Sequence, residues 1–175
     1  MAAAGGALMA VAHPKLALRP FLTVDTPLLA EIFRESVTDL TAEDYTEAQQ
    51  QAWLSGIDDL EAFAKRLGGQ LTLVATLQGS AVGFASLATG GKIDLMYVHP
   101  VAAGQGVGAM LADALENLAG CRGAEKLIVD ASDTARGFFE KRGYVAQQRN
   151  SISVGDEWLA NTTMHKKLAA KQEAS

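Results

Sequence analysis

Apolar residues recur at every third or fourth position through three segments near the start of the chain, which is the period of an amphipathic helix. Pro27 suits the first turn of the first helix, and Gly68 and Gly69 end the third. A short apolar-rich run before them, residues 16–22, predicts a strand. The three predicted helices span residues 23–40, 42–54 and 58–69.

The period of the apolar positions changes to two after residue 69, which predicts strands. Residues 70–89 are expected to form a hairpin with Gly79 and Ser80 in its turn. A strand over 91–100 and a glycine-rich loop then lead into a helix that runs to Gly120. The remaining elements are a strand over 124–132, a helix over 133–143 and two closing strands within 144–168.

This order of elements, β-ααα-β-β-β-α-β-α-β-β, places hairpins in the first half and strand–helix–strand units only around the glycine-rich loop. It predicts an α/β (α+β) single domain with a mixed, mostly antiparallel sheet and helices on both faces. We expect the domain to span residues 15–168. A disordered N-terminal extension, 1–14, and a C-terminal tail, 169–175, flank it.

The composition narrows the function classes. The chain has 175 residues, a formal net charge of −5 and a pI near 5.2, which argues against nucleic acid as a partner. One cysteine, Cys121, excludes an internal disulfide, and three dispersed histidines do not suggest a metal site. No basic residue precedes the apolar N-terminal run and no membrane-span pattern is found, so we expect a cytoplasmic protein that does not bind membranes.

Gly104, Gly106 and Gly108 stand directly before the predicted helix. The first N–H groups of a helix have no partner within it and carry the positive end of its dipole, so bare backbone there suits an anion such as phosphate. A Walker A loop is excluded, because Gly108 is followed by Ala109 and Met110 instead of Lys and Ser or Thr.

A dinucleotide-binding loop of the form G-x-G-x-x-A also fits the glycines, with Asp130 at the end of the next strand as a ribose-binding acid. In that fold, however, the glycines follow the strand immediately. Here five residues, 99–103, intervene, and the unit sits in the middle of the chain.

A third pattern covers far more of the sequence. The run IDLMYVHPVAAGQGVGAMLADAL and the later run LIVDASDTARGFFEKRGYV resemble the two main motifs of the GNAT superfamily of N-acetyltransferases, and the correspondence extends over residues 16–168. Together with DYTEAQQQAW, these runs look most like a YafP-like bacterial subgroup. Two departures stand out. The Arg or Gln that opens the first motif falls on Ala103, and the Asn and Tyr of the second motif fall on Ser132 and Phe139.

The resemblance implies acetyl-CoA as co-substrate and no metal. Backbone N–H groups of the loop would hold the pyrophosphate, the splayed strand before the loop would pair with the pantetheine arm, and an N–H at Met96 or Tyr97 would polarise the thioester carbonyl. Phe139 cannot protonate the leaving thiolate as the family's Tyr does, and Tyr144 or Tyr97 would be a substitute. The predicted cofactor-binding residues are Met96, Tyr97, Val98, Gly104, Gln105, Gly106, Val107, Gly108, Ala109, Ser132 and Phe139.

The acceptor is expected to be a small-molecule or peptide amine. Asp94 precedes Met96 by two residues and should share its strand face, which makes it the candidate to draw the amine's proton or to bind the acceptor; a solvated strand residue is the alternative. Tyr45, Gln49 and Trp53 would share one helix face and line the acceptor pocket, with Trp158 as another wall; for all four, core packing is the alternative.

The function predicted from the sequence is thus acetyl-CoA-dependent N-acetyltransferase. The alternative from another class is a catalytically weak coenzyme-A-binding sensor or regulatory module, which the loss of the family's Tyr keeps open. Homodimers are common among GNAT relatives, so the resemblance is compatible with one. The identity of the acceptor cannot be read from the sequence.

Overall fold

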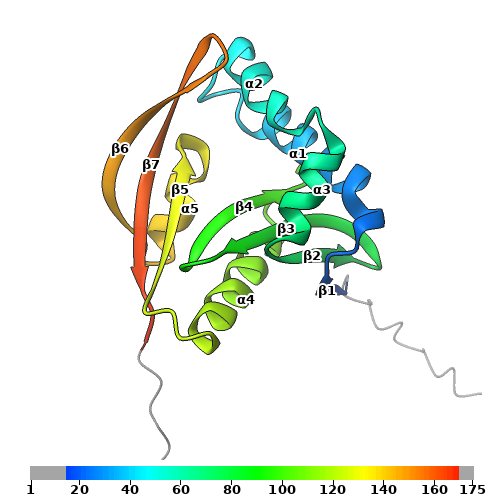
Figure 1. Cartoon of the computed structure of the whole chain (residues 1–175), viewed down its shortest axis with the longest axis vertical. Coiled ribbons are helices and arrows are strands. Elements are labelled where there is room, and N and C mark those ends of the chain that lie inside the picture. Colours follow the sequence, from blue (N-terminus) through cyan, green and yellow to red (C-terminus); the bar gives the residue numbers. More distant parts are fainter. Residues whose placement is uncertain (1–14, 170–175) are drawn as a thin grey trace, which may run out of the picture.

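The computed structural model describes residues 15–169, and these fold around one seven-stranded sheet (Figure 1). The predicted extension, 1–14, and all but the first residue of the predicted tail lie outside the described residues. The strands are β1 Leu16–Pro20, β2 Leu71–Leu77, β3 Ser80–Ala88, β4 Lys92–Val98, β5 Lys126–Ser132, β6 Val145–Val154 and β7 Glu157–Lys167. The helices are α1 Thr26–Leu40, α2 Glu47–Leu54, α3 Leu60–Gly68, α4 Val107–Cys121 and α5 Asp133–Lys141, with short 3-10 turns at Thr23–Asp25, Ser55–Ile57 and Pro100–Ala102.

The strands lie in the order β1-β2-β3-β4-β5-β7-β6, and every neighbouring pair is antiparallel except β4–β5. The order of helices and strands agrees with the prediction throughout. The mixed, mostly antiparallel sheet is therefore confirmed. A parallel pair needs a crossover connection, and α4 supplies it between β4 and β5.

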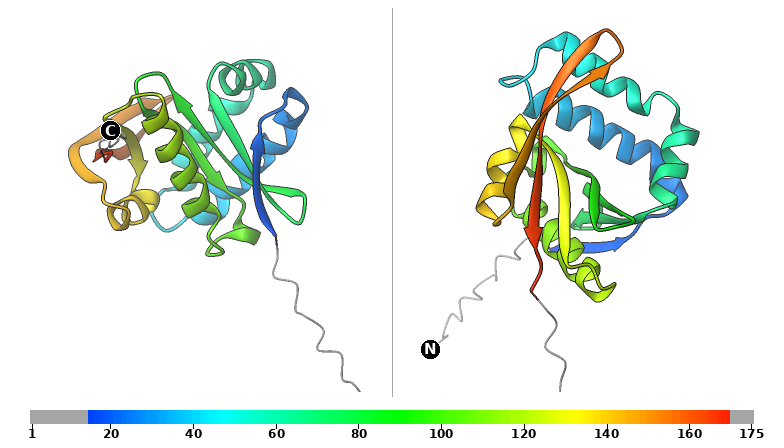
Figure 2. Two further views of the ribbon diagram at one scale, coloured as in Figure 1. Left: turned by 90° about the horizontal axis from the view of Figure 1, so that it is seen from below. Right: turned by 60° about the vertical axis from the view of Figure 1, so that its left-hand side comes forward.

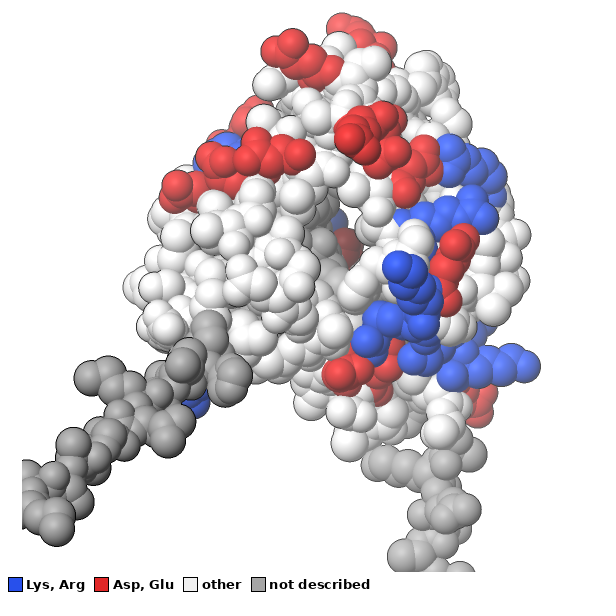
Figure 3. All heavy atoms as spheres, turned by 180° about the vertical axis from the view of Figure 1, so that it is seen from behind, with Lys and Arg blue, Asp and Glu red and all other residues white. Residues whose placement is uncertain are grey.

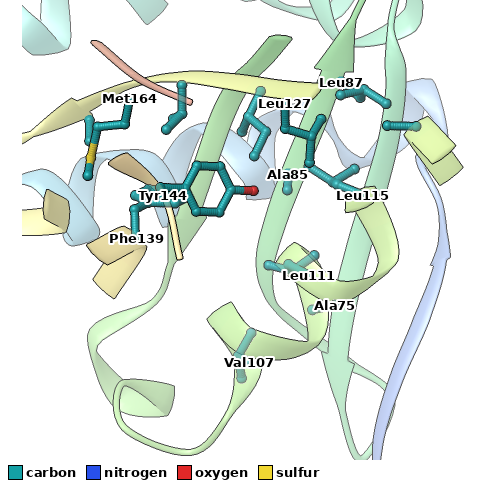
Figure 4. Packing of buried hydrophobic residues seen from close by; sticks show 14 of the residues in the cluster. Ala75, Ala85, Leu87, Val107, Leu111, Leu115, Leu127, Phe139, Tyr144 and Met164 are labelled. Carbon is teal, nitrogen blue, oxygen red and sulfur yellow. The ribbon is translucent and has the colours of Figure 1, made fainter. Parts of the chain in front are cut away.

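Helices cover both faces of the sheet (Figure 2). On one face, α1 and α3 bury Leu29, Phe33 and Phe63 against Val74, Phe84 and Leu95 of the sheet. On the other face, α4 and α5 close a second core, which Figure 4 shows from close by. This second core joins Leu111 and Leu115 of α4 to Leu127 of β5 and Met164 of β7.

The sheet opens in its middle. β4 and β5 pair only at Lys92–Ile128 and Ile93–Val129, and beyond these two pairs the strands diverge. In Figure 1 the separation is visible between β4 and β5, with the long β6–β7 hairpin reaching past them to α2. This break exposes the backbone edge of β4 between the two halves of the sheet, as expected from the GNAT resemblance.

Three local details differ from the sequence-based expectation. The first hairpin turns at Gln78 and Gly79, one residue earlier than predicted, because both take positive φ angles (51° and 83°) that suit a two-residue hairpin loop. Helix α2 begins at Glu47, not near residue 42, because Thr46 caps it: its side chain accepts from Gln49 N, and the Gln49 side chain accepts from Thr46 N.

The third difference is a β-bulge in β4. Ser86 lies opposite Leu95 while the next residue, Leu87, lies opposite Ile93, so Asp94 is the extra residue on β4. An extra residue reverses the alternation of side chains beyond it. The bulge therefore decides which face of the sheet Asp94 occupies.

Candidate functional site

The glycine-rich loop ends in a helix start that is open to an anion. Gly106 caps α4 in the left-handed conformation (φ 85°), which a residue with a side chain adopts only under strain. Among the described residues, no hydrogen-bond acceptor is found for the N–H groups of Val107, Gly108 and Ala109. These donors and the helix dipole together suit a phosphate group.

Gln105 plays a different part from the one predicted. Its backbone N–H donates to Ala102 O (3.3 Å), and its side-chain Nε2 donates to Val101 O (3.0 Å). Both groups hold the loop to the preceding 3-10 turn. Gln105 therefore fixes the conformation of the loop before α4, and the hydrogen-bond donors for an anion are the N–H groups in the first turn of α4.

The exposed edge of β4 has a defined register. His99 N donates to Val82 O, and hydrogen-bonded pairs alternate along an antiparallel ladder, so Tyr97 and Leu95 also bond toward β3. The N–H and C=O groups of Met96 and Val98 therefore point to the open side, where β5 has diverged. Of the two residues considered for polarising the thioester, only Met96 presents its N–H to that side.

Two hollows meet at the opening of the sheet, and Figure 3 shows the surface hollowed between the two halves of the molecule, with charged groups visible inside. The splay cavity, about 270 Å³, includes Met96, Val98, Gly108, Phe138 and Phe139 in its walls. The hairpin cavity, about 380 Å³, lies under the β6–β7 hairpin and includes Arg66, Ile152, Val154, Leu159 and Asn161. Four residues line both: Trp53, Tyr97, Asp130 and Ser132.

These features agree with the comparison to known proteins. The model of the acetyltransferase (GNAT) domain family matches residues 41–168. The chain belongs to the GNAT acetyltransferase family. It is 29% identical over 150 residues to YafP of Escherichia coli (strain K12), described as an uncharacterized N-acetyltransferase, with 86% of this chain and 95% of that protein covered.

Solved structures show the same GNAT fold. A protein from Rhodopseudomonas palustris, described as a GCN5-related N-acetyltransferase (aminotransferase, class-II), is 59% identical, with a TM-score of 0.86 over 91% of this chain and 99% of that one. PaiA N-acetyltransferase from Thermoplasma acidophilum, solved in complex with coenzyme A, has a TM-score of 0.73 at 19% identity, covering 87% and 99% of the two chains. YncA from Salmonella typhimurium, solved with its cofactor acetyl-CoA, has a TM-score of 0.61 at 20% identity, covering 92% and 98%.

Met96 and Asp94 both line the splay cavity, but the Asp94 side chain of this GNAT domain does not share the face of Met96. The bulge turns it toward α3, where Arg66 Nε and Nη2 donate to its two oxygens (2.7 and 2.8 Å) and Gln70 Nε2 donates to Oδ2 (2.8 Å). Met96 packs instead with the core on the α4 face. Burial opposes ionisation of this carboxyl, but the hydrogen bonds from Arg66 and Gln70 outweigh it and hold the pKa of Asp94 below its ordinary value.

A second carboxylate, Asp130, was not among the predicted acceptor-site residues. It lies one residue beyond the last β4–β5 pair and lines both cavities. Thr163 Oγ1 donates to its Oδ1 (2.6 Å) and Lys92 Nζ lies 3.1 Å from Oδ2. Burial raises its pKa, yet these two partners outweigh burial and hold the pKa of Asp130 below its ordinary value.

Tyr45, Gln49 and Trp53 do not form the predicted helical stripe, because Tyr45 precedes α2. Tyr45 Oη donates to Ala160 O (2.6 Å) and accepts from Asp133 N (2.9 Å), while Gln49 Nε2 donates to Trp158 O (2.8 Å). Tyr45 and Trp53 line the hairpin cavity, their rings 5.3 Å apart, but Gln49 does not. Gln49 and Tyr45 therefore tie the β6–β7 hairpin to the segment around α2.

Trp158 takes neither of the roles predicted for it. Its neighbour Leu159 faces the hairpin cavity, so Trp158 points to the opposite side of β7, and it lines neither cavity. Its side chain is 62% exposed, which also excludes core burial.

Tyr97 and Tyr144, the two tyrosines considered as substitutes for the missing acid, lie in different environments. Tyr144 packs on Phe139 in the α4-side core (ring centroids 5.0 Å apart, Figure 4), donates to Glu116, and lines neither cavity. Tyr97 lines both cavities and accepts a hydrogen bond from Trp53 Nε1 (3.1 Å). Among the described residues its own hydroxyl proton has no acceptor. Burial raises the pKa of Tyr97, so this proton stays bound at neutral pH.

Phe139 and Ser132, at the motif's Tyr and Asn positions, both reach the splay cavity. Phe139 is 3% exposed and packs in the core. Ser132 caps α5, where its Oγ accepts from Ala135 N (3.1 Å). An Asn at this position would offer the same kind of cap, so the substitution preserves the start of the helix.

Two searches of the described residues gave no candidates. No group of three or more His, Cys, Asp or Glu side chains within residues 15–169 is arranged to hold a metal ion. In the same part of the chain, no helix has the length and apolar character to cross a membrane.

Proposed function

We propose that this acetyltransferase moves the acetyl group of acetyl-CoA to the primary amine of a small acceptor, which attacks the thioester directly. The observation that carries the proposal is the opening between β4 and β5, where the splay cavity and the hairpin cavity meet at Trp53, Tyr97, Asp130 and Ser132. A donor in the splay cavity and an acceptor in the hairpin cavity would meet there. The GNAT structures solved with coenzyme A or acetyl-CoA share this fold and support the choice of donor.

The donor side fits coenzyme A in two respects. The N–H groups of Val107, Gly108 and Ala109, which have no acceptor among the described residues, suit the pyrophosphate. The open N–H and C=O groups of Met96 and Val98 suit the two amides of a pantetheine arm, which can pair with a free strand edge as another strand would. Gly104 and Gly106 allow the loop to turn above this site.

Met96 N–H is the group we assign to the thioester carbonyl. The carbonyl oxygen gains negative charge as the amine attacks, and a fixed backbone donor that needs no reorganisation stabilises that charge. Acetyl-CoA supplies an activated acyl group whose leaving group is a thiol, which can depart as the thiolate.

Tyr97 replaces the family's tyrosine in our proposal. Trp53 fixes the hydroxyl oxygen of Tyr97, and the hydroxyl proton, which has no acceptor within residues 15–169, would donate toward the departing sulfur. Because the pKa of Tyr97 is raised above that of a thiol, the proton is shared with the thiolate and not given up to it. The thiolate takes its final proton from solvent.

Neither carboxylate serves as the base in this scheme. The pKa values of Asp94 and Asp130 both lie below the ordinary value, so each is ionised and a weak proton acceptor at neutral pH. We assign Asp130 to holding the acceptor's ammonium group at the opening, from which water removes the proton. Asp94 acts indirectly, by holding Arg66 in the wall of the hairpin cavity.

The test is an acceptor screen with acetyl-CoA in which free thiol is followed against a control without acceptor. Amine-dependent thiol release, with a rise in Tm on adding coenzyme A, is the expected result. Binding of coenzyme A without thiol release for any amine would favour the sensor module instead, for which the absence of a hydroxyl at the buried Phe139 position is the supporting observation.

A further inference from the structure

The walls of the hairpin cavity carry two opposite charges. Arg66 from α3 and Asp130 from β5 are the charged residues that line it. Asp94 occupies Nε and Nη2 of Arg66, and within residues 15–169 no acceptor is found for Nη1. The Arg66 side chain is 45% exposed, so this nitrogen remains available to a ligand.

Asp130 is also able to receive a further donor. Thr163 and Lys92 take one position on each of its oxygens, which leaves acceptor positions for a further donor. Because Asp130 also lines the splay cavity, an ammonium group bound to it lies at the point where the two hollows meet.

Most of the remaining wall residues are apolar or aromatic, and Ser55, Ser132 and Asn161 are the uncharged polar ones. The β6–β7 hairpin contributes Ile152, Val154 and Leu159, and the aromatic residues are Tyr45, Trp53 and Tyr97. The bonds from Tyr45 and Gln49 to β7 hold this hairpin in place over the cavity. A hollow of about 380 Å³ with such walls suits a compact molecule better than a protein segment.

We propose that the acceptor is an α-amino acid with an apolar or aromatic side chain: Asp130 binds its amine, Arg66 Nη1 binds its carboxylate, and the hairpin and the aromatic residues enclose its side chain. This inference rests on the acetyl transfer proposed above. The amine nitrogen forms a bond to the acetyl carbon as the carbon–sulfur bond breaks. The amine's proton passes to water, and the products are the N-acetylamino acid and coenzyme A thiol.

Matched acceptors test the carboxylate. With acetyl-CoA, and with each kcat/KM calculated on the concentration of unprotonated amine, L-phenylalanine should exceed 2-phenylethylamine and L-phenylalaninamide by roughly 10- to 100-fold, the effect of a charge-assisted hydrogen bond. A higher kcat/KM for the amide or for the decarboxylated amine than for L-phenylalanine would overturn the proposal. A higher kcat/KM for dipeptides than for L-phenylalanine would also overturn it and would indicate a peptide N-terminus as the acceptor.

Variants on one helix locate the effect. In Arg66→Gln the ratio of kcat/KM for L-phenylalanine to that for 2-phenylethylamine should fall toward one. Lys65→Gln, the adjacent exposed residue that lines neither cavity, should leave the ratio at the wild-type value. A general disturbance of the fold would lower both rates without moving their ratio. An unchanged ratio in Arg66→Gln would overturn the role of Arg66, and Arg66→Lys repeats the test with charge retained if the Gln variant does not fold.

Calorimetry separates this proposal from the proposed transfer. L-Phenylalanine should bind the wild-type protein in the presence of coenzyme A, and Arg66→Gln should weaken that binding by the same roughly 10- to 100-fold. If L-phenylalanine binds in a way that depends on Arg66 but no thiol is released, the proposed binding of an amino acid is supported and the proposed acetyl transfer is contradicted. Thiol release with other amines, without binding of L-phenylalanine, would do the reverse.

Discussion

The hydroxyl of Tyr45 donates a 2.6 Å hydrogen bond to the carbonyl of Ala160, which lies 115 residues further along the chain. The same oxygen accepts from the N–H of Asp133 at the start of α5. One phenol thus connects the segment before α2, the β6–β7 hairpin and the start of α5.

Tyr45→Phe should lower the free energy of unfolding by about 1–3 kcal/mol, because it leaves a carbonyl and an N–H without their partner in a partly buried site. Urea denaturation measures the loss. The KM for the acceptor should rise as well, since the hairpin loses a support. A change in stability below about 0.5 kcal/mol would show that water replaces the hydroxyl at little cost.

Ala109→Glu should weaken coenzyme A binding roughly tenfold or more, because a carboxylate in the first turn of α4 lies near the pyrophosphate and repels it. A Glu there is favourable to the helix itself, so folding should not suffer. Ala109→Gln has the same shape without the charge and should bind coenzyme A nearly as well as the wild type does. Calorimetry at low salt compares the three proteins; equal affinity in the Glu and Gln variants would remove the α4 N-terminus from the donor site.

The dependence of kcat/KM on pH should follow the acceptor and not the protein. The pKa values of Asp94 and Asp130 are lowered, so neither carboxylate titrates between about pH 6 and 9, whereas the amine must lose its proton before it attacks. The rate should rise about tenfold per pH unit up to the amine's own pKa. Two acceptors of different amine pKa, such as L-phenylalaninamide and 2-phenylethylamine, should give displaced curves. A common curve for both would reveal a titrating group on the protein.

Asp94→Asn should act mainly on the acceptor KM. It removes the charge that holds Arg66 but no group that takes a proton, so the shape of the pH profile should be unchanged. Affinity for coenzyme A serves as the control, because the α4 start lies elsewhere. A fall in kcat that higher pH restores would return Asp94 to the role of base.

Tyr97→Phe should lower kcat by roughly 10²-fold, the size typical of losing one donor to developing charge, while coenzyme A affinity holds. Phe139→Tyr is the converse change: it places a hydroxyl at the family's usual position, and turnover should stay level or rise by no more than about 10²–10⁴-fold. Rapid-mixing assays of thiol release measure both. A large loss in Phe139→Tyr with intact coenzyme binding would show that this buried ring matters chiefly for packing.

Much of the fold could be predicted because the apolar period changes sharply between helices and strands, and each helix start or strand end carries a glycine, a proline or a polar residue. The start of α2 was misplaced although its signal is present: Thr46 and Gln49 form the spacing of a capping box. Taking Tyr45 as helical hid its role as a bridge to Ala160.

The site was predictable only where it depends on backbone. The chemistry proposed for the loop from Gly104 to Gly108 lies in backbone N–H groups, so the pattern of glycines before a helix is enough to predict it as a candidate anion site. The face of Asp94 depends on a bulge opposite Ser86 and Leu87 that no residue pattern indicates, and this shift of one residue places its side chain on the face opposite to the predicted one. The place of Asp130 depends on β5 lying beside β4 and then leaving it, which is a property of the assembled sheet.

Two residue pairs between β4 and β5, Lys92–Ile128 and Ile93–Val129, form the seam that joins the two halves of the sheet. Past that seam, each half presents backbone groups that an ordinary sheet would satisfy internally. A bound pantetheine arm would act there as a removable eighth strand, completing the fold for the duration of one turnover. The protein and its substrate would then share one hydrogen-bonded architecture, and each release of coenzyme A would leave the sheet unfinished again.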